Sequence, residues 1–356
     1  MLRVETQAPA NWAAARLTHL PLLQIADDGQ AITTPAAWEQ RKAELMAAWH
    51  QYLGSAPFSA DSLTPAVRRT TEQDIGFGTA EVVYLQTEPG YWEQCLLMIP
   101  KMPAAGDPGR RLPAMVVFYY DIDTPAGIYM GSPRWKGSDP TRAYAQALVQ
   151  RGYVVLVQRW FCEGYISTFK FEAQGPSLSG RYAQAVARFK SVAPFWKGLG
   201  RVVWDAGRCV DFLQTLPMVD PGRIGCMGHS LGGKMALYAG AFDPRFQVVI
   251  SSDLGIGLSF SNWEDPWYLG PEAKKPGFPL DHHQLLAFIA PRPYLLIAGQ
   301  YDGEKSWPYI NSAQDVYRLY GAAERIGMIN HATGHAPTLE ALALAYAWCD
   351  RYLNAM

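Results

Sequence analysis

Short apolar segments alternate with helical segments from residue 114 onward, and this alternation limits the possible folds more than any other feature of the chain. The apolar segments are "AMVVFYY", "YVVLVQ", "RIGCMG", "FQVVISS" and "PYLLIAG", and helical segments such as "TRAYAQALVQRG" and "VVWDAGRCVDFLQTLP" separate them. Strands that are apolar on both faces are typical of a parallel sheet covered by helices on both sides. We therefore expect an α/β protein with a mostly parallel central sheet.

The chain before this alternation contains a predicted amphipathic helix. Residues 35–53 have apolar side chains at helical spacing along one face, which are Trp38, Leu45, Trp49 and Leu53. Gly54 follows as a stop signal. We expect residues 1–70 to form an N-terminal helical extension that packs on the main domain.

The main domain, residues 71–356, is expected to begin with antiparallel strands. The segments "TAEVVYLQTE" and "YWEQCLLMIP" have the composition of β-strands, and the "PG" between them favours a hairpin. After the strand "YVVLVQ", an aromatic-rich segment near residues 160–200 interrupts the alternation. We interpret this segment as a lid-like insertion over the mouth of the sheet.

Charge, hydropathy and cysteine content argue against several classes of function. The net charge of -1 gives no electrostatic reason to expect nucleic acid or an acidic membrane as a partner. No apolar run approaches the roughly 18 residues of a membrane span, and the N-terminus lacks a signal-peptide core. The five cysteines are widely spaced without a Cys-x-x-Cys pair. We expect a cytoplasmic protein without metal or cofactor, and the sequence leaves its oligomeric state open.

The segment "RIGCMGHSLGGKMALYAGAF" contains the most informative motif. Ser230 stands in a G-x-S-x-G pattern, directly after an apolar strand and directly before a helix rich in small residues. A nucleophile elbow needs this order, because its serine occupies a strained turn in which larger neighbouring side chains would collide. The alternative is a serine that only caps the helix. The context favours Ser230 as a nucleophile.

A serine nucleophile needs a base and an orienting carboxylate, and candidates for both follow in the chain. Asp302 in "QYDGEKSWP" is the preferred acid, and it competes with Asp253 in "VVISSDLGIG" and with Glu304. His335 in "NHATGHAPTLEAL" is preferred over His331, because it directly precedes the start of the last helix and because of the resemblance described below. The order serine, acid, histidine is that of α/β-hydrolases.

Two backbone N–H groups are expected to stabilise an oxyanion next to Ser230. The helix that follows the serine directs the N–H of Leu231 at the reacting centre. The second donor is expected after the strand "AMVVFYY", within Tyr120–Ile122, where Asp121 is the central residue. Tyr120 is also a candidate for contact with the substrate.

These segments resemble the α/β-hydrolase superfamily and, more narrowly, the dienelactone hydrolase-like and acetylxylan-esterase-like serine esterases. The resemblance rests on "RGYVVLVQ", "GRIGCMGHSLGGKMALYAGAFDPRF", "RPYLLIAGQYDG" and "GHAPTLEALALAYAW", and it covers most of residues 35–353. It implies the α/β-hydrolase fold and a triad of Ser230, His335 and Asp302. Dienelactone hydrolases proper have a cysteine nucleophile, so Ser230 indicates ordinary ester hydrolysis. Many relatives carry His-Gly in the first oxyanion loop, where this chain has "YYDID".

Two further side chains are candidates for contact with the substrate. Lys234, one helical turn after Ser230, is similar to a lysine that meets the sugar in glucuronoyl esterases, although those enzymes place an arginine where this chain has Leu231. A lysine that only packs along its helix is the alternative. Trp263 in "SFSNWEDPWYLG" either stacks on a sugar ring or packs in the core.

The sequence therefore predicts a serine hydrolase that cleaves a small carboxylic ester of short-acyl or carbohydrate type. A prolyl-oligopeptidase-like peptidase and a glucuronoyl-type esterase are alternative enzymes, and a hydrolase-fold binding protein without turnover is an alternative of another class. His282 and His283 are adjacent and have no further ligand at metal spacing. Asp205 and Arg208 are expected to form an ion pair on one helix face.

Overall fold

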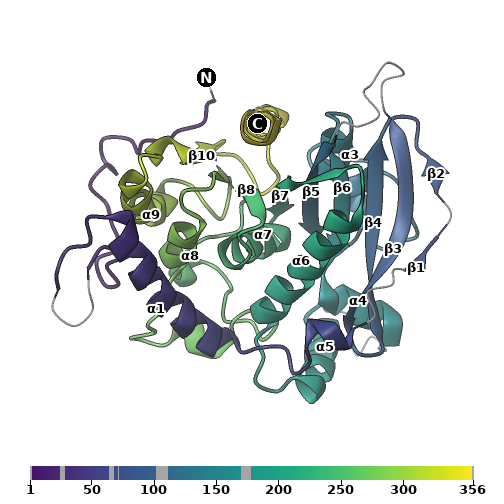
Figure 1. Ribbon diagram of the computed structural model, residues 1–356, viewed down its shortest axis with the longest axis horizontal. Coiled ribbons are helices and arrows are strands. Elements are labelled where there is room, and N and C mark those ends of the chain that lie inside the picture. The colour runs from purple at the N-terminus through teal and green to yellow at the C-terminus, as the bar shows by residue number, and fades with distance from the viewer. Residues whose placement is uncertain are drawn as a thin grey trace.

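The computed structural model describes residues 2–24, 29–63, 68–70, 72–101, 111–169 and 178–354 (Figure 1). The strands are β1 (Arg68–Arg69), β2 (Gln73–Asp74), β3 (Gly78–Glu88), β4 (Tyr91–Pro100), β5 (Leu112–Tyr119), β6 (Val154–Arg159), β7 (Val219–His229), β8 (Phe246–Ser252), β9 (Tyr294–Ala298) and β10 (Ile326–Asn330). The α-helices are α1 (Pro35–Leu53), α2 (Asp123–Ala126), α3 (Tyr144–Val149), α4 (Phe161–Phe169), α5 (Leu178–Val192), α6 (Gly198–Thr215), α7 (Leu231–Phe242), α8 (His282–Ile289), α9 (Trp307–Leu319) and α10 (Leu339–Cys349).

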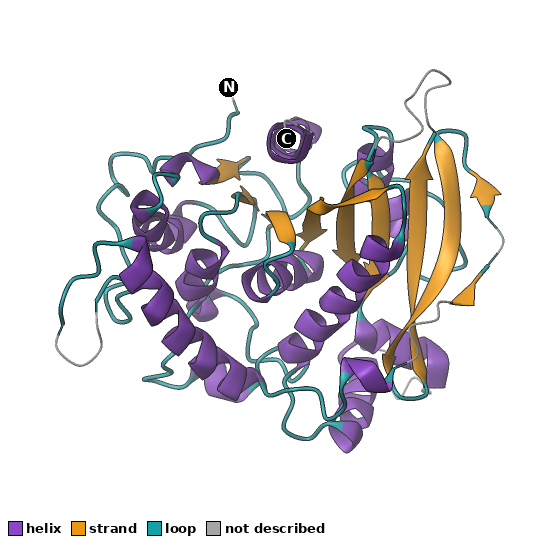
Figure 2. Ribbon diagram, viewed as in Figure 1, coloured by secondary structure: helices purple, strands orange, loops and turns teal. Residues whose placement is uncertain are grey.

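One sheet organises the described part of the chain (Figure 2). Its strand order is β1-β3-β4-β6-β5-β7-β8-β9-β10, and β2 pairs with β3. Neighbours from β6 to β10 are parallel, whereas β3 is antiparallel to β4 and β4 to β6. The predicted sheet, mostly parallel with antiparallel N-terminal strands, is confirmed. The predicted hairpin turn lies at Gly90, whose φ of 76° is accessible to glycine at little cost.

Helices cover both faces of the sheet because successive strand residues point to opposite sides. In β5, Val116 belongs to the apolar cluster under α1, α6, α7, α8 and α9, whereas Met115 and Val117 belong to the cluster under α3 and α10. Such strands are buried on both sides, which explains their continuous apolar sequences. The parallel strands all end at one edge of the sheet, so the loops after β5, β7, β8, β9 and β10 meet there.

The N-terminal helix packs on this core. The four apolar residues of its predicted face are the ones that α1 buries, and Gly54 ends it with a φ of 72°. The indole N–H of Trp49 donates to Gln284 Oε1 at 2.8 Å, which ties α1 to α8. The residue 1–70 extension is therefore joined to the main domain through a shared core, in the part that the structure describes.

The described residues of the predicted insertion include helices α4 and α5, and its residues 170–177 lie outside the described residues. Trp160, Tyr165, Tyr182 and Phe189 are buried in the cluster that also contains α6. Helix α6 begins at Gly198, four residues before the segment predicted as helical. The aromatic residues of this segment thus pack the insertion onto the domain.

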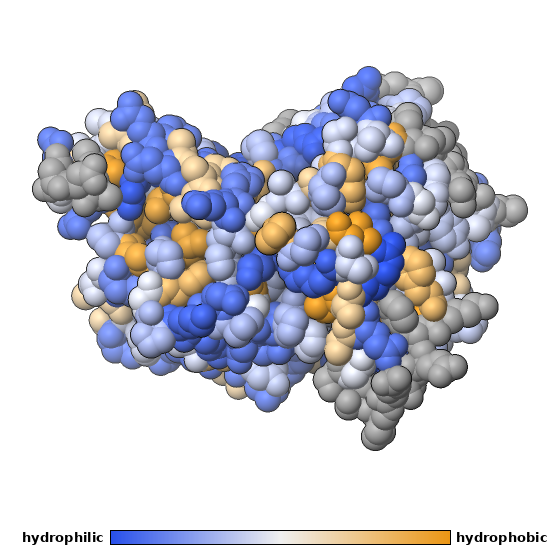
Figure 3. Space-filling model, turned by 90° about the horizontal axis from the view of Figure 1, so that it is seen from below, coloured by the Kyte–Doolittle hydropathy of each residue, from blue (hydrophilic) through white to orange (hydrophobic). Residues whose placement is uncertain are grey.

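Hydrophilic residues cover most of the face seen in Figure 3, and hydrophobic residues form only scattered patches there. Among the helices of the described segments, none has the length and apolar character needed to cross a membrane. All five cysteines are buried and unpaired. The cytoplasmic location predicted from the cysteine pattern stays a prediction.

Candidate active site

Ser230 occupies a strained turn between β7 and α7. Its φ of 57° and ψ of -117° lie outside the regions favoured by residues with a Cβ atom. A Cβ on Gly228 would lie 2.1 Å from the carbonyl oxygen of Gly232, and a Cβ on Gly232 would lie 2.0 Å from that of Phe118. Both glycines are therefore required by close approach of the backbone. The elbow predicted from the motif is present.

His335 lies beside this elbow. Its ring centroid is 4.5 Å from that of His229, the residue before Ser230, and 4.9 Å from that of Tyr301. Its Nδ1 lies 2.6 Å from Asp253 Oδ2. A carboxylate at Nδ1 fixes the proton on that nitrogen and leaves Nε2 to act as a base. Of the two candidate histidines, it is His335 that forms this pair, because His331 Nδ1 instead contacts Thr333 Oγ1 at 2.6 Å.

Asp253 directly follows β8 and has a φ of 40°. Besides His335, its carboxylate accepts the backbone N–H groups of four consecutive residues after β9, namely Gly299, Gln300, Tyr301 and Asp302, at 2.8–3.1 Å. Burial acts to raise the pKa of Asp253, but the hydrogen bonds from His335 and from the Asp302 and Tyr301 N–H groups outweigh it. The pKa of this carboxyl is therefore lower than its ordinary value, and Asp253 is ionised at neutral pH.

The acid predicted from the sequence, Asp302, is not the partner of His335, and this is a correction. Its carboxylate points back into the loop after β8, where it accepts the N–H groups of Gly255 and Ile256 at 2.8 Å and the hydroxyl of Ser306 at 2.9 Å. Only its backbone N–H reaches Asp253. The two aspartates thus connect the two loops, and the loop after β9 contributes backbone donors instead of the acid.

Burial raises the pKa of the Asp302 carboxyl, although the Ile256 and Gly255 N–H groups oppose that effect. The third candidate acid, Glu304, accepts a hydrogen bond from the indole of Trp12 at 3.0 Å on the surface. Neither position contacts a histidine that lies beside Ser230. The only signal for Asp253 in the sequence is its place directly after a strand, which Asp302 nearly shares.

The predicted oxyanion donors lie at the expected edge of the sheet. Leu231 is the first residue of α7, so its N–H is one of the groups without a partner inside the helix. The carboxylate of Asp121 accepts the N–H groups of Asp123 and Thr124 at 3.0 and 2.8 Å and so shapes the loop after β5. The role of the Asp121 backbone N–H stays a prediction.

Lys234 and Trp263 lie next to each other and are buried. Lys234 Nζ is 3.5 Å from the centre of a Trp263 ring and donates to Ser261 Oγ at 2.9 Å. The indole N–H of Trp263 donates to the carbonyl of Gly255 at 2.8 Å. Burial lowers the pKa of Lys234 to about 7, against the attraction of Asp302 and Asp265. Contact of either side chain with a substrate stays a prediction.

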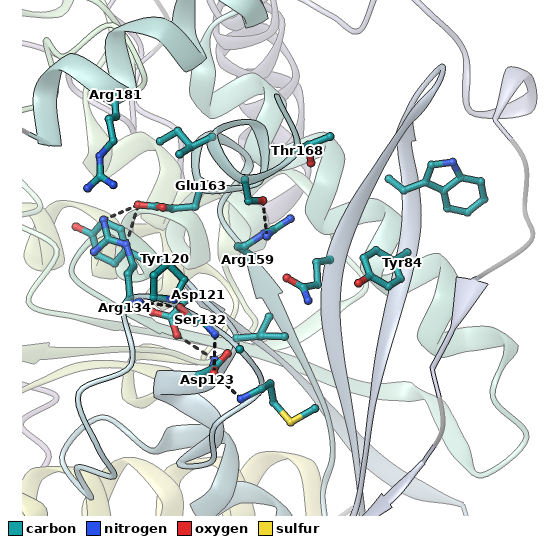
Figure 4. A pocket seen from close by; sticks show the side chains of 18 residues that line it. Tyr84, Tyr120, Asp121, Asp123, Ser132, Arg134, Arg159, Glu163, Thr168 and Arg181 are labelled. Atoms are coloured by element: carbon teal, nitrogen blue, oxygen red, sulfur yellow. Dashed lines mark hydrogen bonds and ion pairs between the residues drawn. The ribbon is translucent and has the colours of Figure 1, made fainter. Parts of the chain in front are cut away.

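Tyr120 is part of the wall of a pocket of about 350 Å³ (Figure 4). The loop after β5, helix α4 and the strands β3 and β4 line it. Its wall combines aromatic rings with charged groups, which include Tyr84, Trp92, Tyr120, Arg134, Arg159 and Glu163. Figure 4 shows Arg134 and Glu163 side by side near Tyr120.

Two arginines of this pocket are held by carboxylates. Arg134 Nε lies 2.8 Å from Glu163 Oε1, and Arg159 Nε lies 2.9 Å from Glu93 Oε1. Asp123 Oδ2 accepts the N–H of Ser132 at 3.0 Å, which fixes the loop that carries Arg134. Aromatic faces and oriented polar groups in one wall suit a ligand with both apolar faces and hydroxyl groups.

The adjacent histidines at the start of α8 have partners in the core. His282 lies 3.0 Å from the Tyr238 hydroxyl and 2.5 Å from the Ile256 carbonyl, and His283 lies 2.8 Å from the Leu20 carbonyl. Within the described ranges, no group of three His, Cys, Asp or Glu side chains is arranged to hold a metal ion. The absence of a metal and of a cofactor stays a prediction.

Comparisons with known proteins give a consistent result. A family model described as fungal glucuronyl esterase matches residues 199–263, which include Ser230 and Asp253. The 4-O-methyl-glucuronoyl methylesterase 1 of Sodiomyces alcalophilus is 35% identical over 26% of this chain, and the aligned part spans only 24% of that relative. The enzyme of the same name from Wolfiporia cocos is 25% identical over 94% of this chain and 80% of its own length.

Solved structures of similar fold agree with these relatives. The glucuronoyl esterase from Solibacter usitatus has a TM-score of 0.69 at 19% identity, over 95% of this chain and 99% of its own. The glucuronoyl esterase from Teredinibacter turnerae has a TM-score of 0.65 at 23% identity, over 99% of this chain and 96% of its own. The α/β-hydrolase fold expected from the sequence is confirmed.

Proposed function

We propose that this member of the α/β-hydrolase superfamily is a serine hydrolase of carboxylic esters that forms an acyl-enzyme on Ser230. The observation that carries the proposal is the pair of His335 and Asp253 beside a serine in a strained elbow. A serine hydroxyl becomes a nucleophile when a histidine Nε2 can take its proton. An ionised carboxylate at Nδ1 of that histidine keeps Nε2 free for this role.

In the proposed reaction, Ser230 Oγ attacks the ester carbonyl and His335 Nε2 takes the serine proton. Asp253 stabilises the resulting imidazolium through Nδ1, and the N–H of Leu231 donates to the oxyanion. His335 then gives its proton to the leaving alcohol, and the acyl group remains on Ser230. Water attacks this ester by the same steps and releases the acid.

For the substrate, we propose a carbohydrate ester, with glucuronoyl esters as the first class to examine. The support is the similarity to relatives named glucuronoyl methylesterases, together with a pocket next to Tyr120 that presents aromatic and polar groups. The side chain of Leu231 is aliphatic and buried, so it supplies no charge to the substrate. A short-acyl ester remains the second candidate, because the elbow and the His335 pair serve either substrate equally.

The first test is covalent labelling combined with an ester panel. A fluorophosphonate is expected to add to Ser230 with a single mass increment, and the adduct is expected to be absent from Ser230→Ala but present in the exposed-serine control Ser191→Ala. In parallel, p-nitrophenyl esters and the methyl and benzyl esters of glucuronic acid are offered to the wild type. Hydrolysis of none of them, or labelling elsewhere than Ser230, would refute the proposal.

A second prediction concerns the cost of burying the charge of Lys234. The ordinary pKa of 10.5 falls to about 7 in the folded protein, so the unfolded chain binds more protons between these pH values. The cost of burying Lys234 is therefore largest at pH 7 and below, and it disappears near pH 10.5. Lys234→Met is expected to raise the free energy of unfolding by about 2 kcal/mol at pH 6. The upper limit is roughly 5 kcal/mol, since a pKa that falls from 10.5 to about 7 corresponds to about 1.4 kcal/mol per pKa unit.

Urea denaturation of both proteins from pH 6 to 10 measures this difference, which should shrink as the pH rises. Lys274→Met is the matched control, because Lys274 pairs with Glu264 at the surface, and it should show no such trend. A Lys234→Met protein that is less stable than the wild type at every pH would contradict the prediction.

A further inference from the structure

The side chain of Tyr120 reaches the proposed nucleophile from the neighbouring strand. Strands β5 and β7 pair in parallel register, with Phe118 opposite Gly228, so Tyr120 and Ser230 occupy equivalent positions just past the two strand ends. The close approach of Gly232 to the Phe118 carbonyl keeps the start of α7 against the end of β5. The Ser230 side chain is close enough to the Tyr120 hydroxyl to act on it, in the direction that lowers the Tyr120 pKa.

The ring of Tyr120 is held on several sides. The rings of Tyr119 and Trp160 contact it edge-on, with centroids 5.4 and 6.0 Å away. The Arg134 guanidinium lies over its face, 4.7 Å from the centroid, and Glu163 fixes Arg134 in place. A donor held by its surroundings needs no reorganisation when charge develops during a reaction. Tyr120 therefore meets the requirement of a preorganised donor.

The Tyr120 hydroxyl is also in the right protonation state. Burial raises its pKa, so the phenol keeps its proton at neutral pH. The positive charge of Arg134 over the ring acts to lower the pKa of Tyr120, which makes its O–H a better hydrogen-bond donor. Leu231, the residue after the nucleophile, has a buried aliphatic side chain. It can therefore donate a hydrogen bond to the oxyanion only through its backbone N–H.

We propose that Tyr120 is a catalytic residue whose hydroxyl donates a hydrogen bond to the carbonyl oxygen as it becomes an oxyanion, beside the N–H of Leu231. This inference rests on the proposed function. In the tetrahedral intermediate the oxyanion and Ser230 Oγ are bonded to the same carbon, so a hydroxyl that contacts Oγ in the free enzyme needs only a small rotation to reach the oxyanion. No proton leaves Tyr120: the serine proton goes to His335, and the phenol keeps its own proton while it donates to the oxyanion.

A purely positional role of Tyr120 predicts a different result. If Tyr120 only held Ser230 in its resting conformation, removal of the Tyr120 hydroxyl would free Oγ for His335 and leave the rate unchanged or higher. A donor to the oxyanion instead contributes in the transition state and little in the substrate complex. The direction of the change in kcat therefore distinguishes the two roles.

Tyr120→Phe is the test, measured on the best ester of the panel. We expect kcat to fall about 10²- to 10³-fold, the usual loss for one oxyanion donor, while KM changes less than about twofold. The affinity for an arylboronic acid, which forms a tetrahedral adduct on serine, should fall by a similar factor. Tyr119→Phe is the matched control, because its hydroxyl accepts from Arg142 at 3.0 Å, and it should keep wild-type kcat.

The outcomes separate this inference from the function on which it rests. A Tyr120→Phe enzyme that still labels with fluorophosphonate and keeps kcat within about threefold would overturn the role of Tyr120 and leave the esterase intact. A wild type without labelling or ester hydrolysis would overturn both. Near-identical thermal unfolding of the Phe variants and the wild type checks that a lost rate reflects the missing hydroxyl.

Discussion

Asparagine in place of Asp253 is expected to lower kcat for ester hydrolysis by about four orders of magnitude, the loss known for the equivalent change in serine proteases. The amide cannot stabilise an imidazolium, and it presents either an N–H or a carbonyl to His335 Nδ1, which is 2.6 Å away in the wild type. The carbonyl form preserves the geometry without the charge, and the N–H form selects the wrong tautomer of histidine. Steady-state kinetics on the p-nitrophenyl ester, with the Ser230→Ala protein as baseline, measure the loss.

Asp302→Asn is the control for this prediction, because it makes the same chemical change in the other candidate acid. The Asp302 carboxylate accepts two backbone N–H groups and one hydroxyl, so the amide leaves a buried donor facing another donor. We expect a loss of about 1–3 kcal/mol in the free energy of unfolding, with kcat reduced less than about tenfold. If Asp302→Asn loses more activity than Asp253→Asn, the acid is Asp302.

The fold could be predicted from the sequence because local patterns specify it. Continuous apolar segments of five to eight residues separated by helices allow few arrangements other than a covered parallel sheet. The elbow could also be predicted from the sequence, because its glycines lie within two residues of Ser230 and close backbone contacts require their small size. His335 could be selected from the family resemblance and from its place in the loop before α10, whose N-cap Thr338 accepts the N–H of Ala341.

The acid could not be selected in the same way, because the choice depends on the path of two loops. Asp253 and Asp302 both follow parallel strands, and both lie between the serine and the histidine in the chain. The strained φ of Asp253 and the four N–H donors around it are properties of the folded loops. No residue type in "SSDLGIG" predicts them. Sequence order alone therefore leaves both Asp253 and Asp302 as candidates for the acid.

The burial and the partners of charged and aromatic side chains also could not be predicted from the sequence. Lys234 and Trp263 are both buried and lie against each other, which their positions in the sequence do not indicate, and their contact with a substrate stays a prediction. The predicted ion pair of Asp205 with Arg208 is wrong for a similar reason. Asp205 faces Arg201 one turn earlier in α6, and Arg208 turns toward Asp211 at 3.0 Å. Helical spacing permits both partners, and tertiary packing selects one.

This buried pair gives the largest expected effect on stability. Arg201 is fully buried, and its guanidinium contacts Asp205 Oδ1 at 2.7 Å, Glu88 Oε2 at 2.9 Å and Thr87 Oγ1 at 2.7 Å. These bonds join α6 to the end of β3. Arg201→Met is expected to lower the free energy of unfolding by about 3–5 kcal/mol, because it leaves a buried carboxylate without its counter-charge. Urea denaturation at pH 8 measures the loss.

The pH dependence of that loss follows from Asp205. Burial raises its pKa to about 7 even though Arg201 acts to lower it, and removal of Arg201 raises it further. In the folded Arg201→Met variant, Asp205 therefore keeps its proton, whereas in the unfolded chain Asp205 loses it above its ordinary pKa near 4. The free energy of unfolding of the variant therefore falls as the pH rises from 4 toward 8. We expect the difference from the wild type to be smaller at pH 5 than at pH 8. A difference independent of pH would show that lost packing, and not the unpaired charge, causes the destabilisation.

Two further variants separate charge from packing at this position. Arg208→Met, in the same helix, removes a guanidinium that pairs near the surface and should cost less than about 1 kcal/mol. Arg201→Met combined with Asp205→Leu removes both charges of the pair, while Glu88 keeps its hydrogen bond from Arg188 at 2.9 Å. The double variant should recover part of the stability lost at pH 8, because apolar side chains often replace a buried ion pair at little cost. If the double variant is less stable than Arg201→Met, the loss comes from packing and hydrogen bonds of this pair that apolar side chains cannot replace.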